Sequence, residues 1–275
     1  MPLQESTELK EFKIKDENLY VNCRDMKGST PMHKAASNGH YEVIELLLDA
    51  GASTKLKNNN GTTPLHCAAA QGHFEVAKLL LRFGAPIDAK ANNGWTALHD
   101  AACDGHTKVV ELLLNNGASV DFSDINGSTP LHRAVTNGHG SVVNLLLNAG
   151  ASTKTKDNNQ WCPLQKAAAC GHEDVVLLLM KTCRYDLNAY DGRTPLYYAN
   201  RFHHYRVGDS LLKAGASDIN EEFERTQRQK YVGFDTIDEV EFLLEDRLTS
   251  LQIAQTIDFN DTSQYFVNIP LCVVQ

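Results

Sequence analysis

The sequence lacks the features of a membrane-spanning or secreted protein. Its 275 residues contain no apolar run near the roughly 18 residues that are needed to cross a bilayer. The seven cysteines include no Cys-x-x-Cys pair, and the polar segment 1–20 does not resemble a secretory signal. We therefore expect a cytoplasmic protein in a reducing environment, without a framework of disulfide bonds.

Basic residues are also scarce, since the sequence has 26 lysines and arginines and 34 aspartates and glutamates, which gives a net charge of −8. Residues 1–217 are neutral overall, and the excess of acid lies in residues 218–275. A protein that binds nucleic acid needs a clustered basic surface to contact the phosphates. We therefore expect no nucleic-acid partner.

Sequence signatures of catalysis are missing as well. The chain contains no G-x-S-x-G, H-E-x-x-H, G-x-x-x-x-G-K or G-x-G-x-x-G motif, which mark hydrolases, zinc peptidases and nucleotide-binding folds. We therefore predict that the protein is not an enzyme and has no cofactor, metal site or small-molecule substrate. The alternative is an enzyme module in the tail, but a segment of about 55 residues is short for a core of its own.

What the sequence does contain is a strict repeat of 33 residues. In the first four copies a glycine is followed two positions later by a threonine, and a histidine follows three residues after the threonine. The glycines are Gly28, Gly61, Gly94 and Gly127, the threonines are Thr30, Thr63, Thr96 and Thr129, and the histidines are His33, His66, His99 and His132. Gly-His pairs recur with the same step, and valines and leucines follow them. A period of this length predicts a stack of identical supersecondary units.

The segment GTTPLHCAAAQGHFEVAKLLLRFGA, residues 61–85, resembles the ankyrin repeat almost throughout. A fifth copy of the motif has Cys162 and Gln165 in place of the threonine and histidine, and a sixth has Tyr197 and His203 in place of the histidine and glycine. The resemblance implies an all-α solenoid of helix–turn–helix units with β-hairpin fingers. It also implies that the protein binds other proteins.

On this basis the chain divides into three parts. Residues 1–24 form a degenerate N-terminal cap, residues 25–219 form six ankyrin repeats, and residues 220–275 form an acidic helical tail. Where a repeat has the Thr-Pro dipeptide, the threonine would cap the first helix and the proline after it would occupy a position where a missing N–H does no harm. Because a single unit leaves its apolar face uncovered, the units must stack.

The histidines are the most conspicuous candidates for chemistry, and ten of the eleven occupy repeat positions. Histidines spaced about 10 Å apart along a stack cannot converge on one metal ion, whose ligands lie about 2 Å away. We therefore interpret them as framework residues that bind loop backbone, with metal binding or catalysis as the alternative. Cys67 occupies a variable position of the repeat and is not predicted to be a nucleophile.

In the ankyrin family the finger tips and the exposed edge of the first helix line a concave protein-binding surface. Trp95 and Trp161 fall at the same repeat position here, and aromatic and arginine side chains are typical of binding hot spots. The alternative is that each tryptophan stiffens neighbouring fingers. Asparagines are frequent at the finger tips, where we predict turns with positive φ. The candidate protein-binding residues are Trp95, Cys103, Asp104, Phe122, Ile125, Asn126, Trp161, Tyr190, Arg193, Arg201 and Phe202.

The tail contains a predicted helix that begins at a capping box of Thr236 and Glu239, and its apolar stripe should pack on the stack or dock a partner. Residues 248–271 loosely resemble the SOCS box, an elongin- and cullin-binding module, although Gln255 stands where that family has cysteine. The last four residues, CVVQ, match the C-a-a-X prenylation signal at Cys272. A single prenyl group would give only weak membrane association.

These features predict a non-enzymatic adaptor or scaffold in the cytoplasm that binds another protein through a concave ankyrin surface. Prenylation of Cys272 would add peripheral contact with a membrane. The alternative is a substrate receptor of a cullin-type ubiquitin ligase, which would use the SOCS-box-like tail.

Overall fold

The computed structural model describes residues 21–182 and 194–216, all within the unit Met1–Asn220. These residues form twelve helices and no β-strand, as expected for an all-α fold. Most of the predicted N-terminal cap and the whole of the predicted tail, 220–275, lie outside the described residues.

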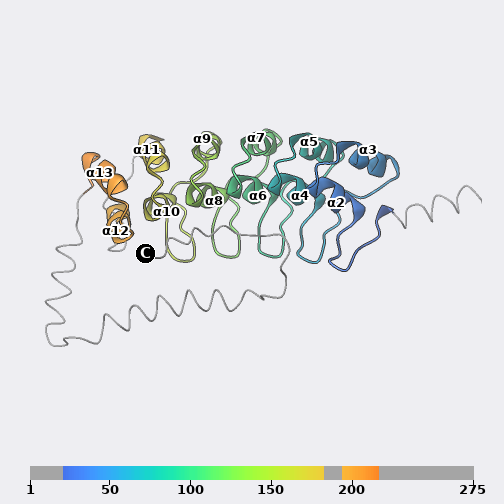
Figure 1. Cartoon of the computed structure of the whole chain (residues 1–275), viewed down its shortest axis with the longest axis horizontal. Coiled ribbons are helices and arrows are strands. Elements are labelled where there is room, and N and C mark those ends of the chain that lie inside the picture. The colour runs from blue at the N-terminus through green and yellow to red at the C-terminus, as the bar shows by residue number, and fades with distance from the viewer. Residues whose placement is uncertain (1–20, 183–193, 217–275) are drawn as a thin grey trace, which may run out of the picture. The chain divides into compact units, whose positions relative to one another are not determined.

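The helices alternate between two rows, which are visible in Figure 1. Each inner helix packs against the helix that follows it in the chain, as α2 does against α3 and α4 against α5, to form a helix pair. Each helix also packs against its neighbours in the same row. The row beside the projecting loops, the inner row, consists of α2 (Pro31–Ser37), α4 (Pro64–Ala70), α6 (Ala97–Cys103), α8 (Pro130–Thr136), α10 (Pro163–Cys170) and α12 (Pro195–Arg201). The outer row consists of α3 (Tyr41–Asp49), α5 (Phe74–Arg82), α7 (Thr107–Asn115), α9 (Gly140–Asn148), α11 (Glu173–Thr182) and α13 (Tyr205–Lys213). The structure therefore confirms helical pairs that stack in chain order.

Five inner-row helices, α2, α4, α6, α8 and α10, begin at a capping box that the repeat motif encodes. At the start of α4, the Thr63 N–H donates to Nδ1 of His66 over 3.2 Å, and Pro64 occupies the first helical turn. The fifth copy keeps this geometry with different side chains, because the Cys162 N–H donates to Oε1 of Gln165 over 2.9 Å. Capping thus explains why a glutamine can replace the histidine of the motif.

The core runs between the two rows and along the stack. Both rows contribute large side chains, such as Leu65 of α4 and Leu80 of α5, and the inner row adds small ones, such as Ala68 and Ala69 of α4. All four are fully buried. Small residues in the inner row let neighbouring helices approach closely, while the outer-row leucines fill the space between the rows.

The loops that join one helix pair to the next, called the fingers, are tight turns. The Asn58 N–H donates to the Thr62 carbonyl over 3.0 Å, and Oδ1 of Asn58 accepts the N–H groups of Asn60 and Thr62. The finger that starts at Asp124 closes in the same way. No β-strand occurs in the fingers that the structure describes, so the β-hairpin form of the prediction is not confirmed.

Candidate functional site

The histidine of the Thr-Pro-Leu-His motif uses both ring nitrogens within the framework. Nδ1 of His66 accepts the Thr63 N–H, which places the ring proton on Nε2, and Nε2 donates to the Trp95 carbonyl over 3.1 Å. Nε2 of His99 contacts the Ser128 carbonyl at 3.2 Å in the same manner. Each ring therefore ties the start of one inner-row helix to the finger of the next pair.

These contacts leave the rings no nitrogen for other chemistry. Burial lowers the pKa of His66, His99 and His132 to about 4, so the three rings are neutral at pH 7. Burial raises the pKa of the Cys67 thiol to about 12, which keeps it protonated. Among the described residues, no group of three or more His, Cys, Asp or Glu side chains could hold a metal ion. The framework interpretation of these residues therefore accounts for their contacts.

The histidine of the Gly-His pair forms a second joint, directed toward the preceding pair. Nε2 of His106 donates to the Ala70 carbonyl over 2.9 Å, and its ring lies against Gly72. A Cβ added to Gly72, which has φ +72°, would lie 2.5 Å from Nδ1 of His106. The glycine is therefore required both for its backbone conformation and for the close approach of the ring.

The finger-tip asparagines connect neighbouring fingers. Nδ2 of Asn92 donates to the Asn59 carbonyl over 2.8 Å, and Nδ2 of Asn59 donates to the Met26 carbonyl over 3.1 Å. Among the described non-glycine residues, Gln160 and His203 have positive φ, and no asparagine does. The prediction that these asparagines adopt positive φ is wrong, because Gly61 and Gly94, two residues after Asn59 and Asn92, take that conformation.

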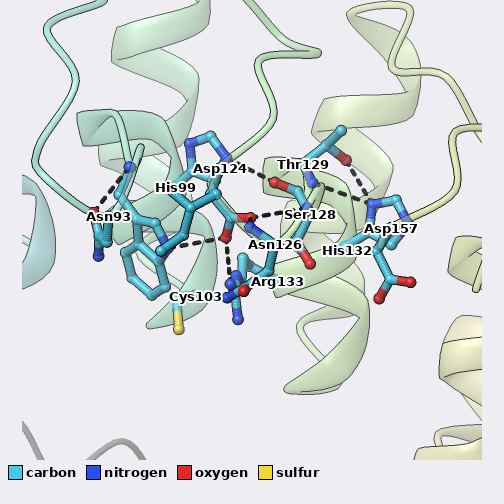
Figure 2. A network of polar contacts seen from close by, with 12 residues as sticks. Asn93, His99, Cys103, Asp124, Asn126, Ser128, Thr129, His132, Arg133 and Asp157 are labelled. Carbon is cyan, nitrogen blue, oxygen red and sulfur yellow. Dashed lines mark hydrogen bonds and ion pairs between the residues drawn. The ribbon is translucent and has the colours of Figure 1, made fainter. Parts of the chain in front are cut away.

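Trp95 is held by a polar network that joins α6 to α8. Its indole N–H donates to Oδ2 of Asp124 over 3.1 Å, and the guanidinium of Arg133 lies over its ring, 4.8 Å from the centroid. Figure 2 shows Asp124 and Arg133 joined by an ion pair beside the His99 ring. His99 in turn stacks on Trp95 at a centroid separation of 6.3 Å. The network fixes the tryptophan in one orientation.

Asp124 is the centre of this network. Burial alone would raise the pKa of its carboxyl group, but the hydrogen bond and charge of Arg133 hold the pKa below its usual value. The N–H groups of Ser128 and Asn126, at 2.9 Å and 2.8 Å, act in the same direction. Asp124 is therefore ionised at pH 7 and anchors its finger to the helix of Arg133.

Trp161 makes an analogous contact with the next pair. Its ring lies 4.3 Å from the ring of Tyr198, centroid to centroid, and its carbonyl faces Nε2 of His132 at 3.1 Å. Both Trp95 and Trp161 are half-buried, so each joins neighbouring pairs and still presents part of its ring to solvent. Their contacts are those expected of residues that stiffen the fingers.

The other candidates differ in exposure. Ile125 and Asn126 are exposed at a finger tip, whereas Phe122 is half-buried with the Lys90 ammonium 4.3 Å from its ring centroid. Arg201 and Phe202 are exposed at the end of α12, and Arg201 donates to the Tyr197 hydroxyl over 3.4 Å. The predicted residues Tyr190, Arg193 and Cys272 lie outside the described residues.

Cys103 and Asp104 lie together at the C-terminal end of α6. The Cys103 sulfur accepts a hydrogen bond from Nδ2 of Asn137 over 3.2 Å, and burial raises the pKa of the thiol to about 11. Asp104 is exposed. Cys103 is therefore a half-buried neutral thiol, and Asp104 beside it presents a charged group to solvent.

Sequence reasoning did not identify Asp124 and Arg133. The signal was present, because an acid and a base stand nine residues apart in several copies of the repeat, as in Asp25 and Lys34. When a single copy of the repeat is considered alone, Asp124 and Arg133 each resemble an ordinary charged surface residue.

A model of a protein family described as ankyrin repeats matches the chain in three copies, over residues 6–91, 83–157 and 149–222. The matches extend through all twelve of the described helices. No helix in the described part of the chain is long and apolar enough to span a membrane.

Proposed function

Because the chain belongs to the ankyrin-repeat family, whose members generally act as protein-interaction modules, we propose that its helix pairs are six repeats of a non-enzymatic adaptor. The partner is another protein. It binds the finger-side face, by which we mean the fingers together with the exposed edge of the inner-row helices.

The observation that carries this proposal is an exposed apolar side chain on a rigid finger. Ile125 is 64% exposed. Its N–H nevertheless donates to the Asn93 carbonyl over 3.1 Å, and its carbonyl accepts a hydrogen bond from Nδ2 of Asn158 over 3.0 Å. A side chain displayed on a backbone that is already held on both sides loses little freedom when a partner covers it.

The neighbouring aromatic residues extend the same face. The half-buried ring of Trp95 belongs to the finger before Ile125, and Trp161 belongs to the finger after it. Phe202 is 43% exposed at the end of α12. Aromatic side chains fixed by their neighbours are typical of binding hot spots, so the surface from α6 to α12 is the proposed contact region.

Affinity capture with the full chain tests this proposal. We expect Ile125→Ser and Phe202→Ser each to weaken binding of the captured partner by about tenfold, the effect of losing a hot-spot contact. Phe83→Ser is the matched control, because Phe83 is 49% exposed at the end of the outer-row helix α5. Capture that falls with Phe83→Ser and not with the other two variants would contradict the proposed surface.

The tryptophans require a different variant. Trp95→Ala with Trp161→Ala would also release contacts to Asp124 and Tyr198, so loss of binding would mix surface and framework effects. Trp95→Phe retains a ring for Arg133 to cover and removes the indole N–H. We expect it to preserve most of the binding that the double alanine substitution abolishes.

We propose in addition that the protein acts in the cytoplasm and that a prenyl group on Cys272 brings it to membranes. The support is the C-terminal CVVQ sequence. Incubation with a prenyltransferase and radiolabelled prenyl diphosphate should label the wild-type chain and leave Cys272→Ser unlabelled. An unlabelled wild-type chain would remove membrane tethering from the proposal.

The second candidate is a substrate receptor of a cullin-type ligase, favoured by the SOCS-box likeness of residues 248–271. In the same capture experiment it requires recovery of elongin and cullin by the full chain and their loss when residues 236–275 are deleted. Recovery of partners without either protein contradicts it.

A further inference from the structure

Three of the described helix pairs contain an internal ion pair with the same geometry. In the first, Nζ of Lys34 on α2 lies 3.1 Å from Oδ2 of Asp25 in the finger nine residues earlier. The pairs of Arg133 with Asp124 and of Lys166 with Asp157 repeat this arrangement on α8 and α10. The rule is a carboxylate in the finger and a cation on the inner-row helix.

The pair that contains α6 departs from this arrangement. Its finger has Ala91 at the aspartate position, and its helix has Asp100 at the position of the cation. The α4 pair has the uncharged Asn58 and Cys67 at the two positions. Among the described pairs, the α6 pair is therefore the one whose helix position carries a carboxylate, and the paired finger position, Ala91, carries no charge.

No neighbouring described residue balances the charge of Asp100 or donates a hydrogen bond to its Oδ2 atom. Its Oδ2 atom is buried and accepts no hydrogen bond from any residue that the structure describes. Arg133, on the adjacent helix α8, donates to Asp124 and covers the Trp95 ring, and its Nε has no hydrogen-bond partner among the described residues, so Arg133 makes no bond to Oδ2 of Asp100. Cys67 on the other side is a neutral thiol. Leaving a buried charged acceptor without a partner is unfavourable.

A second carboxylate lies close by. Asp104 follows Asp100 by four residues, and its N–H donates to the Asp100 carbonyl over 3.2 Å. Side chains four apart on a helix share a face, and the C-terminal end of a helix carries partial negative charge. Burial, and then the charge of Asp104, raise the pKa of Asp100 well above its usual value, as expected for acids without a counter-ion.

We propose that Asp100 and Asp104 form a subsite for a basic side chain, Lys or Arg, of the partner protein. The inference rests on the proposed adaptor function and names one chemical feature of the partner. The incoming cation occupies the role that Lys34, Arg133 and Lys166 fill within their own pairs. Asp104 is exposed and Asp100 is half-buried as a whole residue, so a long side chain can approach this pair of acids from solvent although Oδ2 of Asp100 itself is buried. Hydrogen bonds between ionised groups are the stronger class, so one such contact can select the partner.

The test uses the full chain and small probes that need no knowledge of the partner. N-acetyl-arginine methylamide and N-acetyl-lysine methylamide are titrated while the backbone amide resonances of Asp100 and Asp104 are followed by NMR. N-acetyl-citrulline methylamide, which keeps the shape of the arginine probe without its charge, is the control ligand. We expect saturable shifts with at least one cationic probe and none with citrulline.

Three variants complete the test. Asp100→Asn and Asp104→Asn should each weaken binding of the cationic probe by about tenfold, because a charge-assisted hydrogen bond is lost. Glu111→Gln, which neutralises an exposed acid on the outer-row helix α7 of the same pair, should leave binding unchanged. Equal binding of the citrulline probe, larger shifts in a parallel titration with Ca²⁺ than with the arginine and lysine probes, or no saturable shift would each overturn the proposal.

A fourth variant rebuilds the rule that the other pairs follow. Ala91→Asp with Asp100→Lys supplies a finger carboxylate and a helix cation, so we expect it to fold and to lose binding of the cationic probe. Retained binding would show that the probe sits elsewhere. These titrations contain no partner protein, so they test the subsite at Asp100 and Asp104 independently of the capture experiment, which tests the adaptor function. Either proposal can therefore fail while the other holds.

Discussion

At the scale of single residues, the buried histidines act as neutral connectors. The His66 ring accepts one hydrogen bond at Nδ1 and donates another from Nε2, which only the uncharged imidazole can do. Gln165 fills the equivalent position of the fifth copy and also accepts the capping N–H. This position of the motif therefore requires a side chain that accepts the capping N–H. A histidine also donates a hydrogen bond from Nε2 to the next finger.

This protonation state makes stability depend on pH. The pKa of His66 is about 4 in the folded chain and about 6.5 in the unfolded chain, so the unfolded state binds more protons between these values. The free energy of unfolding that each such histidine contributes is complete above pH 6.5 and falls as the pH drops toward 4. Between pH 7 and pH 5 we expect a loss of about 2 kcal/mol per histidine. Urea unfolding at the two pH values measures it.

His66→Gln isolates one histidine, because glutamine is the chain's own substitute at this position. We expect the variant to be somewhat less stable at pH 7 and to lose about 2 kcal/mol less than the wild type on going to pH 5. An equal loss in both proteins would show that His66 is not the group that titrates.

At the scale of elements, the Gly-His joint determines how closely neighbouring pairs approach. The His106 ring occupies the space that a side chain at position 72 would fill, and its hydrogen bond to the Ala70 carbonyl keeps it there. The sixth copy has His203 in the glycine position, with φ 61°. Its Cβ stands where the histidine of a further identical unit would lie, so α12 cannot accept another pair through the same joint.

Two glycines with the same backbone conformation separate the joint from the backbone effect. Gly84 has φ +73° with nothing within 4 Å of an added Cβ, whereas Gly72 has φ +72° and the His106 ring at 2.5 Å. Gly84→Ala should therefore cost about 1–2 kcal/mol, the strain of a left-handed alanine. Gly72→Ala should cost about 3 kcal/mol or more, because overpacking adds to the strain. Equal losses of unfolding free energy for the two variants, measured by urea unfolding, would mean that the His106 ring moves aside without cost.

At the scale of the whole stack, stability is a sum over interfaces between adjacent pairs. A middle pair such as α6–α7 packs against two neighbours, whereas a terminal pair has one described neighbour. The two most exposed leucines lie in the terminal pairs, with Leu46 of α3 69% exposed and Leu212 of α13 51% exposed, whereas Leu177 of α11 is 39% exposed. The ends therefore have less apolar burial to lose on opening.

Amide hydrogen exchange on the full chain should show this gradient. We expect the slowest exchange in α6 to α9 and faster exchange in α2–α3 and α12–α13, because an end pair opens by breaking a single interface. Uniform protection along the stack would indicate either global cooperativity or a stabilising contact made by residues outside the described ranges.

The sequence by itself determined the local parts of this protein. The 33-residue period located the helix pairs, and the Thr-Pro dipeptides located the starts of α2, α4, α8 and α12, because capping and apolar spacing act within a few residues. It also indicated that histidines such as His99 serve the framework, since repeated residues cannot converge. Asp124 and Arg133 were missed because their significance appears only when copies are compared pair by pair.

The tertiary structure decided what depends on the register between pairs. The bond from Asn92 to the Asn59 carbonyl and the bond from the Trp95 indole N–H to Asp124 join residues about one repeat apart in the chain, and the isolation of Asp100 also depends on neighbouring pairs. No local preference specifies such contacts, because each depends on how closely one pair approaches the next. Packing of α6 between α4 and α8 turned an acid at a variable position into a buried carboxylate without a partner, and that is the physical basis for the proposed recognition of a basic side chain.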